Sequence, residues 1–331
     1  MDDPNSSLPA NGIGAPSESP MSTPLTPQSG TPPFITKVFI GPDGLRSGWS
    51  LLLYLLMGFA LGEGFALFQH ALRRLPELWR FFVGEGISLV VVVVPAIFMG
   101  WIEKRPFGAY GYPRKGAFGK LFWLGMLWGI VALTTLMLFM RTVGAYYFGS
   151  LALHGMRLYK FAAFWAVFFV LVGLFEEFML RGYTQFTLGR GIGFWPTACL
   201  LSFAFGAIHL RNQGENVVGA LGAAIIGLFF CLTLRRTGNL WFAVGLHASW
   251  DWGETFLYSV ANSGLQAPGH LLNPSFQGPT WLTGGTVGPE ASVFVFVVMG
   301  LMWIVFHLLY PPVKRVEAGL APPATPVAYQ E

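Results

Sequence analysis

The chain has 331 residues, of which 53% are apolar and only 11% are charged, and its formal net charge is +4. Soluble domains carry about 25% charged residues, so this composition excludes an ordinary soluble protein and indicates a membrane protein. No basic patch interleaved with aromatic residues accompanies the positive charge. Nucleic-acid binding is therefore not expected, and the charge is better interpreted as a topology signal.

The chain begins with a segment rich in Pro, Ser, Thr and Gly, which cannot bury enough apolar surface to order itself. We predict a disordered cytoplasmic tail over residues 1–45. The segment lacks the features of a signal peptide, so we expect the first apolar span to be retained as an anchor. A second, Pro-containing cytoplasmic tail is predicted over residues 311–331.

Eight apolar stretches follow the first tail, each close to the roughly 20 residues that a helix needs to cross a bilayer. Spanning segments must satisfy their own backbone hydrogen bonds, and the alternating pattern of a membrane barrel is absent, so we expect helices. The predicted fold class is an all-α polytopic transmembrane bundle of about eight spans with a polar intramembrane cavity. The predicted spans are Trp49–Phe68, Phe81–Trp101, Leu121–Met140, Phe161–Leu180, Gly191–Leu210, Val217–Leu234, Leu240–Ser259 and Ala291–Tyr310.

Lysine and arginine are more frequent in alternate connections between these spans. Under the positive-inside rule, this asymmetry predicts that both termini are cytoplasmic. The long stretch Ala261–Glu290 contains no Lys or Arg, as expected of a translocated loop. We predict a multi-pass protein of the plasma or inner membrane.

Ionisable side chains interrupt the apolar stretches, and such groups usually face a bundle interior and mark a functional site. Glu177 and Arg181 stand at i and i+4, the favourable order for a helical ion pair, and we predict a structural pair. Glu176 points about 100° away and has no cation at a neighbouring helical position. It therefore needs a metal, a histidine or a trapped water, and could serve as a general base. The alternative is that both acids lie solvated at the cytoplasmic interface.

Two of the histidines in later stretches are candidates for the site. His209 shares a helical face with Phe205, which is a weak signal alone, because a histidine near a helix end is more often structural. His247 and Asp251 also share a face, so the carboxylate can fix the tautomer of the imidazole, or both can ligate one ion. A structural hydrogen bond between these two side chains is an equally acceptable interpretation.

Together these side chains supply the parts of a hydrolytic centre: a free carboxylate to activate water, two imidazoles and an acid to orient them. No His-Glu-x-x-His motif, nucleophile elbow, P-loop or dinucleotide fingerprint indicates another chemistry. Glu63, Glu85 and His307 also fall in spans, and we interpret them as helix–helix hydrogen-bonding residues. Cys199 and Cys231 have no disulfide or metal-binding spacing, so we interpret them as packing residues.

Three short fragments, in this order and on successive membrane helices, carry a family resemblance. They are Glu176-Glu177-x-x-x-Arg181, Phe205-x-x-x-His209 and His247-x-x-x-Asp251. Together they resemble the motifs of the CAAX protease and bacteriocin-processing family, the intramembrane endopeptidases that include the type II CAAX prenyl proteases. Residues 284–290 resemble a glycine-rich segment that precedes the last helix in many bacterial members. We place a CAAX-protease-like catalytic membrane domain over residues 161–310, after N-terminal membrane helices over residues 46–160.

The resemblance implies that Glu176 activates the attacking water and that His209, His247 and Asp251 complete the centre. The family pattern accepts Asn or Asp at the last of these positions. An ionised carboxylate only accepts hydrogen bonds and cannot stabilise an oxyanion, which favours Asp251 as a metal ligand or a histidine orienter. His209, His247 and Asp251 with a water would form the usual ligand set of a catalytic zinc. A metal-free mechanism fits the same residues.

We therefore expect an intramembrane endopeptidase that cleaves a peptide or lipidated protein near the cytoplasmic side of the bilayer. One placement conflicts with this expectation, because His209 ends a helix that runs to the opposite face. The conflict disappears if the segment Gly191–Leu210 is re-entrant, tilted or begins later. The alternatives are an ion-coupled transporter with a proton relay, which no inverted repeat supports, and an inert membrane scaffold or immunity protein.

Overall fold

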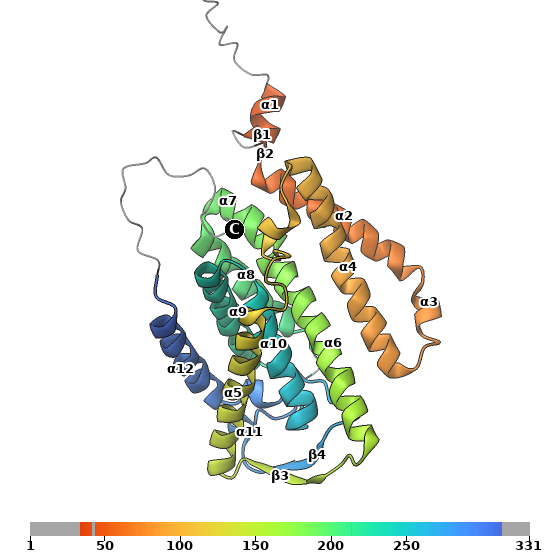
Figure 1. Cartoon of the computed structure of the whole chain (residues 1–331), viewed down its shortest axis with the longest axis vertical. Helices are drawn as coiled ribbons and strands as arrows, with labels where there is room; N and C mark the ends of the chain where they lie inside the picture. The colour runs from red at the N-terminus through yellow and green to blue at the C-terminus, as the bar shows by residue number, and fades with distance from the viewer. Residues whose placement is uncertain (1–33, 42–43, 213, 313–331) are drawn as a thin grey trace, which may run out of the picture.

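The computed structural model describes residues 34–41, 44–212 and 214–312, which form a bundle of helices (Figure 1). The α-helices are α1 (Phe34–Phe39), α2 (Ser47–Ala66), α3 (Gln69–Leu72), α4 (Glu77–Glu103), α5 (Lys120–Thr142), α6 (Met156–Arg181), α7 (Tyr183–Ile192), α8 (Phe194–His209), α9 (Val217–Thr237), α10 (Trp241–Trp252), α11 (Thr280–Thr283) and α12 (Phe294–Leu309). The remaining elements are the 3-10 helices η1 (Phe107–Tyr110) and η3 (Pro289–Ala291), the π-helical segment η2 (Gly253–Leu257), and the strands β1 (Ile40–Gly41), β2 (Gly44–Leu45), β3 (Tyr146–Leu151) and β4 (Leu272–Phe276).

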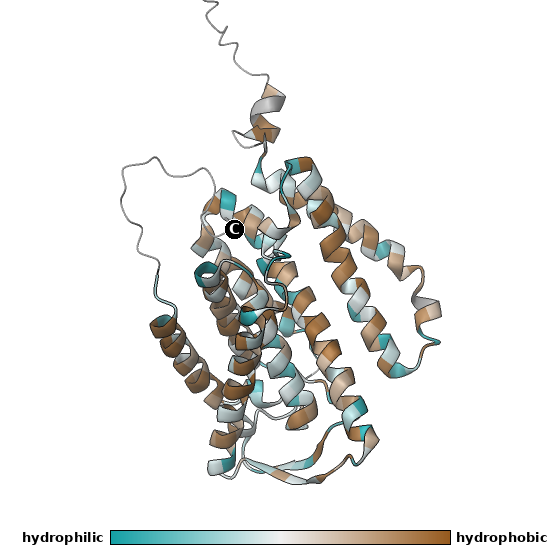
Figure 2. Ribbon diagram, viewed as in Figure 1, coloured by the Kyte–Doolittle hydropathy of each residue, from teal (hydrophilic) through white to brown (hydrophobic). Residues whose placement is uncertain are grey.

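The predicted all-α membrane bundle is confirmed. Among the described residues, five helical segments are long and apolar enough to cross a membrane: α2, α4, α5, α6 with α7, and α9. Apolar residues cover most of the length of these helices, whereas hydrophilic residues gather at their ends and in the connections (Figure 2). Each of the eight apolar stretches predicted from the sequence is mainly helical.

Three of the predicted spans are shorter helices than their hydropathy indicates. The segment Gly191–Leu210 is divided at Gly193, whose φ of 87° ends α7, and α8 then has only 16 residues. The predicted span Leu240–Ser259 consists of the 12 residues of α10 followed by the π-helical turn η2. The last span, Ala291–Tyr310, contains the 16-residue α12. Hydropathy averages do not register these breaks, because the residues on both sides are apolar.

Part of the predicted N-terminal tail is ordered. Residues 34–41 and 44–45 form α1 and the β1–β2 ribbon, because the Phe39 ring packs on Trp49 with centroids 4.6 Å apart. The Trp49 indole N–H also donates to the carbonyl of Val38 at 3.1 Å. The rest of the predicted first tail, and nearly all of the predicted tail over residues 311–331, lie outside the described residues.

Two peripheral features flank the central helices (Figure 1). The α2–α4 pair packs beside α6 and α7 on one side of the bundle. At the end of the bundle opposite α7, strands β3 and β4 form an antiparallel ribbon, with Tyr146 opposite Phe276 and Leu151 opposite Leu272. The Tyr146 hydroxyl donates to the carbonyl of Tyr258 at 2.8 Å, which joins this ribbon to the segment that follows α10.

The central contact of the bundle is the close approach of α5 and α10. Gly125 and Gly129 form a small-xxx-small pattern on α5, a spacing that lets membrane helices approach closely. A methyl group at Gly125 would collide with the carbonyl of Phe242, and one at Gly129 would collide with the Ser249 hydroxyl. Because α10 carries His247 and Asp251, this contact fixes the position of half of the predicted site. Helix α5 thus packs along the helices of residues 161–310, although it lies before the domain limit drawn from the sequence.

Gly129→Ala should destabilise the fold, because the added methyl group has no space between α5 and α10. Overpacking of this kind typically costs about 1–3 kcal/mol. The measurement is the thermal unfolding midpoint of the purified protein in detergent. Gly300→Ala on α12 is the matched control, since a methyl group there meets nothing within 4 Å. Equal midpoints for the two variants would contradict the close-packing interpretation.

Candidate active site

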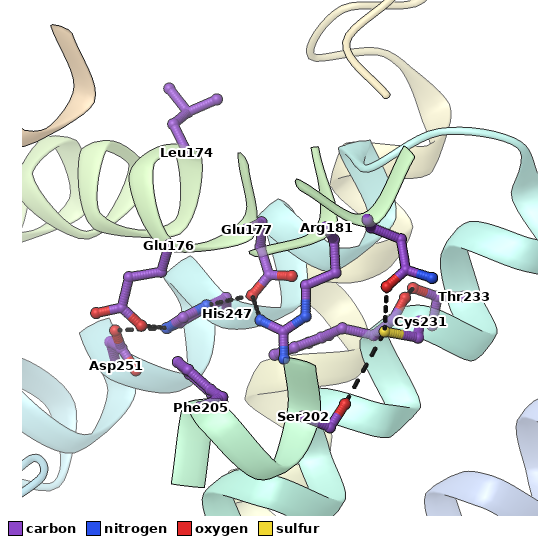
Figure 3. Close-up of polar contacts among 12 residues, drawn as sticks. Leu174, Glu176, Glu177, Arg181, Ser202, Phe205, Cys231, Thr233, His247 and Asp251 are labelled. Atoms are coloured by element: carbon purple, nitrogen blue, oxygen red, sulfur yellow. Dashed lines mark hydrogen bonds and ion pairs between the residues drawn. The ribbon is translucent and has the colours of Figure 1, made fainter. Parts of the chain in front are cut away.

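The predicted polar residues of α6 and α10 face one another (Figure 3). Glu176 Oε2 lies 3.7 Å from His247 Nε2, and Asp251 Oδ2 lies 3.5 Å from the same nitrogen. Glu176 keeps a quarter of its side chain exposed, whereas the side chain of Asp251 is 9% exposed. The two acids therefore share one imidazole nitrogen, and Glu176 is the one that water reaches.

Glu177 does more than pair with Arg181. Its Oε1 atom lies 3.4 Å from Arg181 Nη1, as the helical spacing predicts, but only 2.9 Å from His247 Nδ1. The side chains of Glu177 and Arg181 are 0% exposed. An Nδ1–H that donates to Glu177 fixes the orientation of the ring and leaves Nε2 directed toward Glu176 and Asp251. Glu177 is thus a positioning residue for His247, a role that sequence spacing did not reveal because the contact joins two helices.

Aromatic rings surround the buried Arg181 guanidinium. The guanidinium lies over the Phe205 ring at 4.6 Å and over the Phe230 ring at 5.5 Å, distances typical of cation–π contacts. The Phe230 ring also stacks on the His247 imidazole, with centroids 5.6 Å apart and planes 9° apart. These rings exclude water from the Glu177 ion pair and restrict the motion of the imidazole.

His209 reaches the same region from the end of α8. Its Nδ1 lies 2.8 Å from the carbonyl oxygen of Phe205, so Nδ1 carries the proton and donates. The Phe205 ring contacts the imidazole edge-on, with centroids 4.5 Å apart. In the neutral form of this tautomer Nε2 is unprotonated and can accept a proton or a hydrogen bond. Helix α8 begins after Gly193, later than the predicted start of the span at Gly191, and it ends at His209.

All four predicted catalytic side chains line one cavity. Its volume is about 400 Å³, and its lining includes Glu176, His209, His247 and Asp251. Polar side chains that the sequence analysis did not assign to the site also line it, namely Glu85, Asn212, Glu215, Thr255, Asn262, Ser263 and Glu290. Burial raises the pKa of the Glu215 carboxyl, which lies on the connection between α8 and α9.

Glu85 differs from its predicted role as a helix–helix hydrogen-bonding residue. It lies on α4 and lines the cavity, and its buried Oε1 has no hydrogen-bond partner among the described residues. The α2–α4 pair thus contributes a carboxylate to the cavity from outside the predicted catalytic domain. Glu63 and His307 are exposed, and neither lines the cavity.

The predicted zinc ligands are not arranged as a metal site. Over residues 34–41, 44–212 and 214–312, no group of three His, Cys, Asp or Glu side chains is placed to hold a metal ion. His247 uses Nδ1 for Glu177 and directs Nε2 at two carboxylates. Among the described residues, His209, His247 and Asp251 are thus not grouped as a three-ligand set in this arrangement.

The apolar helices and the buried polar cluster define an integral membrane protein with an enclosed polar centre. Residues 158–253 match the family model described as type II CAAX prenyl endopeptidase Rce1-like. The match extends from the start of α6 to the end of α10 and confirms the family resemblance of the motifs. This region is therefore similar to a type II CAAX prenyl endopeptidase domain. Comparisons with curated proteins and with solved structures gave no match.

Arg181→Ala should destabilise the protein, because it leaves Glu177 with one buried partner fewer. Removing one member of a fully buried ion pair typically costs about 3–5 kcal/mol. The measurement is the unfolding midpoint and the monodisperse yield in detergent. Arg157→Ala, at an exposed position near the start of the same helix, is the control. If Arg181→Ala were as stable as wild type yet inactive, Arg181 would be a catalytic residue and not a structural one.

Proposed function

We propose that this protein is an intramembrane endopeptidase in which Glu176 activates a water molecule for attack on a peptide carbonyl. The observation that carries the proposal is that the carboxylates of Glu176 and Asp251 both lie near Nε2 of His247. These three side chains line a cavity that His209 also lines. Ionisable groups inside a membrane protein's apolar helices are energetically costly, so those that are present usually serve a function. The Rce1-like match supports the same class of reaction.

Glu176 is the residue best suited to be the general base. It has no cation at a neighbouring helical position, and its exposed edge allows a water to approach the carboxylate. In the first step Glu176 takes a proton from the water, and the water oxygen bonds to the peptide carbon. The unprotonated Nε2 of His209 can accept a hydrogen bond from the same water and orient it.

His247 and Asp251 stabilise the charges that then develop. The imidazolium form of His247 keeps both ring protons throughout the cycle, and it donates from Nδ1 to Glu177 and from Nε2 toward the carbonyl oxygen of the substrate. Asp251 balances the positive ring. In the second step the carbon–nitrogen bond breaks, and the proton held by Glu176 passes to the leaving amine. The products are a carboxylic acid and an amine, and Glu176 is again ionised.

We further propose a membrane-tethered substrate that is cut near the cytoplasmic side. The positive-inside distribution of Lys and Arg supports this orientation. The substrate class follows from the family description, which names CAAX prenyl endopeptidases. A peptide with a farnesylated C-terminal C-a-a-X sequence is therefore the first probe, and a pool of lipid-anchored peptides is the second.

Glu176→Gln should abolish cleavage of these probes, because the amide keeps the shape of the side chain but cannot accept a proton as a base. The loss of kcat from a missing general base is expected to be at least about 100-fold. Cleavage is measured by mass spectrometry with purified protein in liposomes. Glu63→Gln, an exposed acid on α2, is the control and should keep wild-type activity. Wild-type rates in Glu176→Gln would remove Glu176 from the mechanism.

Cleavage should persist after exhaustive chelation, because no described group of side chains is placed to hold a metal ion. Asp251→Asn separates the two mechanisms further. A neutral amide is a poorer zinc ligand, so a zinc enzyme should lose metal and activity together. Without a metal, the amide adds a hydrogen-bond donor, and activity should be kept or raised. Stoichiometric zinc by elemental analysis, with activity lost on chelation and restored by zinc, would establish the metal mechanism.

A further inference from the structure

One donor in the cavity has no assigned role. The side chain of Asn262 lines the cavity, and its amide nitrogen Nδ2 is buried without a hydrogen-bond partner among the described residues. Buried polar groups are almost always hydrogen-bonded, so an orphaned donor calls for an explanation. Asn262 also lies outside residues 158–253, the region that matches the family model.

The backbone around Asn262 is held in a tight turn. Asn262 and Leu265 exchange two backbone hydrogen bonds of 3.0 Å and 2.8 Å. Between them, Ser263 has a φ of 44° and Gly264 a φ of 84°, the left-handed region that few side chains adopt. Non-glycine residues in this region persist only where the surroundings determine them, and they cluster at functional sites. The turn therefore presents the Asn262 side chain from a fixed backbone.

Glu290 holds this turn in place. Its Oε2 atom accepts hydrogen bonds from the Ser263 backbone N–H at 2.9 Å and from the Ser263 hydroxyl at 2.8 Å. The Gly264 N–H donates to the carbonyl of Val287 at 2.9 Å. The glycine-rich segment before α12 thus fastens the turn to the cavity wall. Glu290 is a positioning residue in this arrangement.

The chemistry of the site requires such a donor. Hydrolysis of a peptide bond places negative charge on the carbonyl oxygen, and preorganised donors stabilise that charge. Asp251 is acceptor-only when ionised and cannot supply a hydrogen bond. His247 Nε2 lies 3.5 Å from Asp251, and the Asn262 side chain lies near the same carboxylate and interacts favourably with its charged form. Two donors therefore approach Asp251 from different elements.

We propose that Asn262 Nδ2 is an oxyanion donor, which acts with His247 Nε2 on the carbonyl oxygen of the scissile peptide bond. The proposal rests on the proposed endopeptidase function. Asn262 lies in a loop, outside the helices that carry the other catalytic residues. Its amide would supply the hydrogen bond that an Asn at position 251 could donate and Asp251 cannot. The donor that Asp251 lacks is supplied by Asn262.

The experiment measures kcat and KM for wild type, Asn262→Leu, Asp251→Asn and the double variant, with the farnesylated peptide and the pool of lipid-anchored peptides. Leu keeps the branched shape of the Asn side chain and removes the donor. Loss of one oxyanion donor is expected to lower kcat by roughly 100-fold to 1,000-fold with little change in KM. In the double variant, the amide at position 251 should restore at least about tenfold of this loss, since neighbouring residues that share a function are not additive.

Two controls make the result specific. Asn273→Ala removes an exposed Asn on β4 that donates to Ser150 at 3.2 Å, and it should leave kcat unchanged. The unfolding midpoint of each variant shows whether the protein is folded, and Asn262→Ala provides a second, smaller replacement if Asn262→Leu is not.

The possible outcomes separate the proposed function from the role of Asn262. Wild-type kcat in folded Asn262→Leu or Asn262→Ala would overturn the oxyanion assignment while the endopeptidase function stands. A lowered kcat that the Asp251→Asn change does not restore would also overturn it, because a purely structural role predicts additive losses. If wild type cleaves neither probe, the proposed function fails and the inference fails with it.

Discussion

The buried carboxylate of Glu177 is the contact on which the rest of the site depends. It joins Arg181 on its own helix to His247 on α10, and both ion-pair partners on α6 are withdrawn from water. A charge in this position is strongly destabilising unless it is paired and hydrogen-bonded. The pairing therefore fixes the rotation of α6 relative to α10, and with it the direction in which the neighbouring Glu176 points. Because adjacent residues on a helix differ by about 100°, one residue serves the ion pair while the next faces the cavity.

The packing of the helices supports this electrostatic arrangement from the other side. The small residues of α5 allow α10 to approach closely, and no side chain at Gly125 or Gly129 separates their backbones. Helix α10 is too short to span a bilayer by itself, and the π-helical turn that follows it begins two residues after Asp251. Turns of this type are frequent at functional sites. A short helix held by its neighbours is a rigid platform for His247.

The sequence predicted the helical bundle and the local pairs well, for physical reasons. Apolar length identifies a membrane helix, and an i, i+4 spacing identifies neighbours on one helix, as with Glu177 and Arg181. Contacts between helices depend on the faces that meet after packing, so the bond from Glu177 to His247 could not be predicted from spacing. Hydropathy also could not locate the break at Gly193, since apolar residues lie on both sides of it. Asn262 belongs to a turn without a motif, and only the glycine-rich segment ending at Glu290 indicated that this region matters.

The cavity combines several acids with few hydrogen-bond donors. This imbalance explains why different residues balance the charge and donate the hydrogen bond. A carboxylate at position 251 stabilises the positively charged form of His247. It cannot, however, donate the hydrogen bond that an amide at this position would donate. In a cavity that is partly shielded from solvent, an unmatched oxyanion costs more than in water, because the effective dielectric is low. The charge-balancing group and the hydrogen-bond donor must then come from different residues. The orphaned amide of Asn262, on a turn held by Glu290, meets that requirement from a segment beyond the two helices that carry the base and the imidazole.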